Sequence, residues 1–269
     1  MAVFESFRDG WTALRTTPGL LLAGGLLVAL SLVGALDLGT AEPGADLAVA
    51  LALPFALGGF LATAATAVRG GECSLRSFLR AGAANYLRLV GAAVLFVLGV
   101  GLVMAVSTAV GFVPVVLVAV AGFTEVAALS AGLGAAMSFV ATLVVLAAAL
   151  LFLQFSAPAI VAEDRGVVDA FRRSGGLVRR NLGGTVGFTL LWALAVEFVP
   201  MLGPLLDLGG VGLPVAFPAT VAVVGIVSVV GLTYCYTVYV AYFLRLTGAL
   251  PARDRAAGRV DPDSPVGTQ

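Results

Sequence analysis

The chain alternates long apolar stretches with short clusters of arginine. Several long stretches carry no charged residue at all, among them residues 19–36, 47–68, 89–124 and 126–162. A helix needs roughly 20 apolar residues to cross the hydrocarbon core of a bilayer, which is about 30 Å thick. Each stretch is therefore of the right order for at least one membrane span, and the pattern predicts an all-α, polytopic membrane helical bundle.

The simplest interpretation of this pattern gives six transmembrane helices. Their expected ranges are 19–36, 47–68, 89–110, 136–159, 182–199 and 218–243. The two longest apolar runs hold more residues than two spans need, and together they could contain four. Because four spans would require tight turns with almost no polar residues, we favour two long helices.

Proline and glycine predict two interruptions of the helical pattern. We expect a break around Gly111–Pro114, with residues 111–134 forming an apolar cap or a short re-entrant piece at the outer face. Residues 200–218 contain four prolines and four glycines and predict a similar stretch. Irregular backbone at membrane depth is tolerated only where protein covers it or water reaches it.

Composition and charge agree with a membrane location and add an orientation. The chain is 60% hydrophobic and 11% charged, with a mean hydropathy of +1.08, whereas soluble domains are about 25% charged. All fifteen basic residues are arginines, and they lie only at the two ends and between spans 2 and 3 and spans 4 and 5. Because basic residues mark cytoplasmic loops, we expect a plasma-membrane protein with both termini cytoplasmic.

The densest arginine cluster lies in residues 165–180. On a helix that turns 100° per residue, its charged residues share one side and its apolar residues the other. We expect a cytoplasmic elbow helix that leads into span 5, with its apolar side against the bilayer. It either binds no ligand or binds anionic lipid headgroups. The candidate headgroup residues are Arg165, Arg172, Arg173, Arg179 and Arg180.

Two further segments, residues 4–14 and 75–88, also place an apolar stripe beside arginines. Each of the three predicted elbow helices precedes a pair of spans. The pattern is typical of a single transmembrane domain, residues 1–250, built from parallel helix-hairpin repeats. The repeat units are 1–68, 69–162 and 163–245. Residues 251–269 contain three prolines and predict a disordered cytoplasmic tail.

Two stretches resemble a known family. Residues 154–188, QFSAPAIVAEDRGVVDAFRRSGGLVRRNLGGTVGF, and residues 58–94 resemble an uncharacterised haloarchaeal integral-membrane family. More distantly, both are similar to the membrane domain of some glycerophosphoryl diester phosphodiesterases. The resemblance implies an all-helical bundle with interfacial elbows and implies no activity. Since the sequence shows no soluble catalytic domain, we do not expect it to share the phosphodiesterase reaction.

Three polar residues are candidates for a cavity or an intramembrane site. Glu197 follows Asn181 by sixteen residues, about 24 Å along a helix, so it lies within the hydrocarbon if span 5 starts at the inner interface. Alternatively, Pro200 ends the helix and Glu197 sits at the outer interface. Gln154, near the end of span 4, could line a cavity or bond to a neighbouring helix.

Small and aromatic residues add two expectations about packing. Gly183 and Gly187 have the spacing of a close helix–helix contact. Four of the five tyrosines lie in residues 234–242, where we expect an aromatic belt at the inner face of the membrane.

The sequence lacks the usual signatures of catalysis. It has no histidine, its two cysteines lack metal-ligand spacing, and no phosphate-binding or dinucleotide motif is present. We therefore expect no enzyme activity, metal, cofactor or nucleic-acid partner.

Two functions remain open. We favour a non-enzymatic membrane module that organises anionic lipids or partner proteins, among them a second copy of the chain. The alternative is a permease or lipid-handling carrier. A central cavity lined by Gln154, Glu197 or Asn181 would favour the carrier, and a solidly packed bundle would favour the module.

Overall fold

The computed structural model describes residues 2–35, 43–121, 124–208 and 217–250, and most of these residues lie in helices. This part of the chain contains no strand, which confirms the predicted all-α class. The helices are α1 (Ala2–Thr16), α2 (Gly19–Ala35), α3 (Pro43–Val68), α4 (Leu75–Val120), α5 (Thr124–Leu153), α6 (Ser156–Ala162), α7 (Val167–Arg180), α8 (Leu182–Leu208) and α9 (Phe217–Leu246).

Several helices have the length and composition of membrane spans, as a membrane protein requires. Within the described residues, four segments qualify outright: Leu47–Val68, Leu75–Val113, Gly132–Ala162 and Gly225–Leu246. A fifth candidate is α1 together with Gly19–Ser31, a pair bent by 103°. In α8 the apolar segment is shorter, Leu182–Glu197.

The first predicted elbow exists as α1, and it packs along α9. Arg245 of α9 is only 9% exposed and forms ion pairs with two acidic residues of α1, Glu5 and Asp9, the second at 2.6 Å. The Tyr234 hydroxyl donates to the Phe7 carbonyl at 3.1 Å. These contacts fix the two ends of the described chain against each other.

The second predicted elbow is not a separate helix, and that prediction was wrong. Ser74 caps the start of α4, since its Oγ accepts from the Ser77 N–H at 3.1 Å. From there α4 runs for 46 residues, about 69 Å at 1.5 Å per residue. Asn85 could have capped a new helix, but its side chain donates to the Ala81 carbonyl at 3.0 Å. Nothing therefore ends the first helix before the apolar segment begins.

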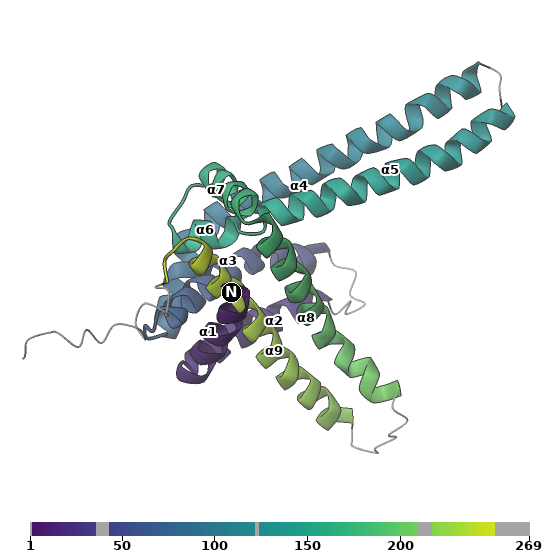
Figure 1. The fold of residues 1–269 in the computed structure, drawn as a ribbon. Helices are drawn as coiled ribbons and strands as arrows, with labels where there is room; N and C mark the ends of the chain where they lie inside the picture. The colour runs from purple at the N-terminus through teal and green to yellow at the C-terminus, as the bar shows by residue number, and fades with distance from the viewer. Residues whose placement is uncertain (1, 36–42, 122–123, 209–216, 251–269) are drawn as a thin grey trace, which may run out of the picture.

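The expected break at Gly111–Pro114 and the cap over residues 111–134 were also wrong. Helix α4 continues through Gly111–Pro114 to Val120, and α5 begins at Thr124. The two helices form an antiparallel hairpin that projects from the rest of the molecule (Figure 1). Gly111 permits this close approach, because a Cβ there would lie 2.7 Å from the Ser138 Cβ. In the other expected interruption, 200–218, α8 is helical to Leu208 and residues 209–216 lie outside the described chain.

The fourth predicted span is broken near its inner end into α5 and α6. Ser174 of α7 bridges the break. Its Oγ donates to the Phe152 carbonyl at 2.6 Å and accepts from the Phe155 N–H at 3.1 Å. Pro158 falls in the first turn of α6, where a helix needs no backbone donor. The predicted span over 136–159 thus falls within the candidate span Gly132–Ala162, but it consists of two helices rather than one.

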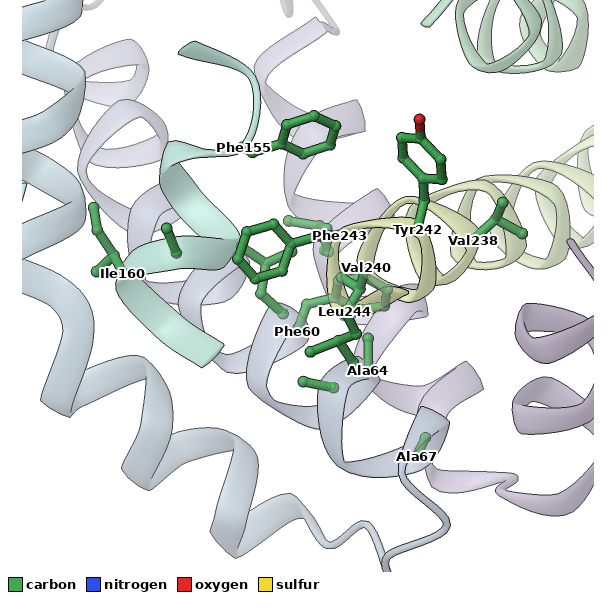
Figure 2. Packing of buried hydrophobic residues seen from close by; sticks show 14 of the residues in the cluster. Phe60, Ala64, Ala67, Phe155, Ile160, Val238, Val240, Tyr242, Phe243 and Leu244 are labelled. Carbon is green, nitrogen blue, oxygen red and sulfur yellow. The ribbon is translucent and has the colours of Figure 1, made fainter. Parts of the chain in front are cut away.

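The core lies where the arginine-bearing ends of the helices meet. Phe60 of α3, Phe155 and Ile160 around α6, and Phe243 and Leu244 of α9 are fully buried in one cluster (Figure 2). The α4–α5 hairpin, by contrast, exposes large apolar side chains along its length. The α4–α5 hairpin therefore extends away from this packed base (Figure 1).

Candidate functional site

A cleft of about 870 Å³ opens between the hairpins next to the packed base. Residues of α2, α3, α4, α5, α6, α8 and α9 line it, together with Phe171 of α7. The lining is mostly apolar and includes no charged side chain. A second hollow of about 400 Å³ between α4 and α5 shares Phe96, Leu153 and Phe171 with the cleft. The two spaces are therefore neighbours with a common wall.

Gln154 places a polar group in this apolar wall. It lies at the break between α5 and α6, and its backbone carbonyl accepts from the Tyr239 hydroxyl. Its Oε1 is 3.0 Å from the Thr189 hydroxyl of α8. Its Nε2 is buried and has no hydrogen-bond partner among the described residues. A buried donor without an acceptor is costly. This amide is therefore a candidate for a hydrogen bond to a ligand in the cleft.

Aromatic residues form the wall beside Gln154. The Trp192 indole N–H donates to the Cys235 carbonyl at 3.0 Å, which holds the ring, and the ring meets Tyr236 edge-on at 5.6 Å. Tyr242 is 1% exposed and stacks on Phe188 at 4.1 Å. Of the four tyrosines expected to form an aromatic belt, Tyr242 is buried, whereas Tyr234, Tyr236 and Tyr239 are half-buried and contact other rings of the protein, so the belt stays a prediction.

Only Gln154 of the three predicted cavity residues lines the cleft. Asn181 is exposed and ends α7, where its side chain donates to the Leu177 carbonyl at 3.2 Å. Glu197 is exposed on α8 and is not among the lining residues. Asn181 thus belongs to a helix end. The alternative that Pro200 ends the helix after Glu197 was wrong, because α8 continues to Leu208.

Two of the predicted headgroup residues form ion pairs within the protein. Arg165 and Arg173 both bind Glu163, the second at 3.2 Å. Burial alone would raise the pKa of Glu163, but hydrogen bonds and charge from the two arginines outweigh it and lower the pKa below its usual value. A separate ion pair joins Arg88 of α4 to Asp164. These contacts tie the segment before α7 to the base.

The remaining headgroup candidates face outward on α7. Arg172 lies 3.8 Å from Asp169, and both side chains are largely exposed. Arg179 and Arg180 are exposed and form no ion pair within the described part of the chain.

The opposite side of α7 packs on protein rather than on lipid. Ala170 and Val178 are fully buried and Leu177 nearly so, in contact with the α5–α6 region. The expectation that this side lies against the bilayer was therefore wrong, although the helix itself was predicted correctly.

Comparison with known protein families gives one match over nearly the whole described chain. Residues 1–246 match the model of a domain of unknown function, DUF7847. No curated protein matches the chain. No solved structure matches it either. The matched range includes every helix described above.

Proposed function

The chain belongs to the DUF7847 family, a domain of unknown function, and on that premise we propose that it is a non-enzymatic, lipid-handling membrane protein. The molecule it handles lies in the cleft between the hairpins. The observation that supports this is the cleft of about 870 Å³ with Gln154 in its wall. Ligand sites typically enclose about 300–1,000 Å³ and combine an apolar lining with a few placed polar groups.

A membrane module that organises anionic lipids is the second candidate. It draws support from Arg172, Arg179 and Arg180, which share the outward face of α7. Each basic residue beside an anionic leaflet contributes about 1 kcal/mol at low salt. The two proposals are compatible, because the arginine face and the cleft lie on different sides of α7.

The proposal includes an arrangement in the plasma membrane. Six spans would form three parallel helix-hairpin units, with both termini in the cytoplasm, as the distribution of arginine favours. Single cysteines in a cysteine-free chain test this with an impermeant maleimide on intact cells. We expect labelling at positions 46 and 207 and none at positions 76 and 253. Labelling at either of the last two would contradict the orientation.

Native mass spectrometry of the purified protein tests the lipid site. We expect a co-purifying lipid that Ala157→Phe removes, since Ala157 lines the cleft. Ala141→Phe is the matched control, because Ala141 is exposed on α5 and does not line the cleft. Equal lipid retention by both variants would contradict the proposal.

A further inference from the structure

The single proton of the Thr189 hydroxyl determines which groups of the Gln154 amide remain unpaired. The Thr189 Oγ lies 2.8 Å from the Thr185 carbonyl and 3.0 Å from the Gln154 Oε1. A hydroxyl has one proton and can donate to only one of these two acceptors. The shorter contact is the one within α8. When Thr189 donates there, its oxygen remains free to accept a hydrogen bond from Gln154.

Turning the Gln154 amide by 180° satisfies this arrangement with almost no change in shape. One N–H of the amide then donates to the Thr189 hydroxyl oxygen. The second N–H and the Oε1 have no partner among the described residues. One donor and one acceptor of the same planar group are thus left unpaired in the wall of the cleft, and the side chain must turn toward the cleft for a ligand to reach the buried position.

We propose that the ligand of the cleft is an uncharged lipid with a free hydroxyl group, held by the Gln154 amide. This inference rests on the lipid-handling function proposed above. A hydroxyl both accepts and donates, so one ligand oxygen can satisfy both free groups of the amide. A charged headgroup is disfavoured, since no charged side chain lines the cleft and an unpaired buried charge is strongly penalised.

Tryptophan quenching in the full chain measures binding at this site. The protein has two tryptophans, and Trp192 lines the cleft whereas Trp11 does not. Trp11→Phe therefore leaves one reporter in the cleft, and Trp192→Phe leaves a reporter that measures background quenching from the micelle. The probes are 9,10-dibromo-octadecanol, its methyl ether and 9,10-dibromostearate at pH 8, each titrated by mole fraction in detergent.

The alcohol should half-quench Trp192 at about one-fifth of the mole fraction that the ether needs, because the ether leaves the amide acceptor unpaired. The carboxylate should be the weakest ligand. Gln154→Met should abolish the preference for the alcohol over the ether. Ser138→Ala, which removes a hydroxyl in the α4–α5 hairpin outside the cleft, should preserve it.

Two other outcomes separate this inference from the function on which it rests. If alcohol and ether quench Trp192 equally in the otherwise unchanged protein, the cleft binds apolar chains and the hydroxyl proposal is wrong. If no probe quenches Trp192 above the background of the Trp11 reporter, the lipid site itself is refuted. Neither test depends on the Gln154 variant being well folded.

Discussion

Ser174→Ala should destabilise the protein more than any other removal of a single serine hydroxyl. Ser174 is fully buried, and its Oγ joins the end of α5 to the start of α6 through Phe152 and Phe155. Phe155 is itself fully buried. Alanine at position 174 would leave the Phe155 backbone N–H without an acceptor and would remove the donor to the Phe152 carbonyl.

The expected loss follows from these two contacts. A buried backbone donor without a partner costs roughly 1–3 kcal/mol, and a lost hydrogen bond about 1 kcal/mol. The sum predicts a decrease in the free energy of unfolding of about 2–4 kcal/mol. Ser6→Ala is the matched control, since Ser6 is equally buried but its hydroxyl bonds only to the Ala2 carbonyl of its own helix. That change should cost less than about 1 kcal/mol.

Unfolding in mixed micelles by increasing SDS, followed by circular dichroism, measures both variants against the unaltered protein. If the Ser174 bridge stabilises the fold, the free energies of unfolding of the two serine variants differ by more than about 1 kcal/mol. If Ser174→Ala and Ser6→Ala have the same unfolding midpoint, the bridge across the helix break does not stabilise the fold and its assigned role is wrong.

Three further predictions concern charge, close packing and lipid contact. The pKa of Glu163 is lowered in the folded state, so its ion pairs stabilise the protein above the ordinary carboxyl pKa of about 4.3 and are lost as the pH falls below it. Glu163→Gln should thus lower the SDS midpoint at pH 7 and match the unaltered protein in strong acid; an equal deficit at both pH values would contradict this. Gly24→Ala should destabilise by about 1–3 kcal/mol, because a Cβ there would lie 1.9 Å from the Thr233 Oγ1, whereas Gly183→Ala has open space and should change the midpoint little. Joint replacement of Arg179 and Arg180 by Gln should reduce the co-purifying anionic lipid seen by native mass spectrometry without shifting the midpoint; unchanged lipid would exclude a headgroup site there.

The sequence predicted helices where apolar and charged residues segregate, and it failed where a helix needed a reason to stop. Helices α1 and α7 were expected because their arginines lie on one side. The second elbow is not a separate helix, because no residue caps α4 before its apolar segment begins. The helix does not break at Gly111–Pro114, where α5 packs closely against Gly111. Stop signals in such chains depend on neighbouring helices, which local patterns do not encode.

The candidate site was predicted in only one of its main residues. Gln154 was selected for its polarity within an apolar span, and it does line the cleft. Thr189 and Trp192 were missed, since neither type is unusual in a membrane helix and only the packing of α8 brings them to Gln154. The Gly183–Gly187 contact was wrong, because both glycines face open space. Close approaches occur instead at other glycines, among them Gly24 and Gly111.

The length of α4 has a consequence for the membrane around it. Its charge-free part, residues 89–120, is about 48 Å long, while the hydrocarbon core measures about 30 Å. A rigid rod of that length fits such a slab only at a tilt of about 50°, beyond the usual range of 0–40°. An ordinary bilayer would therefore have to thicken around the α4–α5 hairpin or let it lie steeply aslant. This hydrophobic mismatch would make the protein favour thick bilayers and deform thin ones.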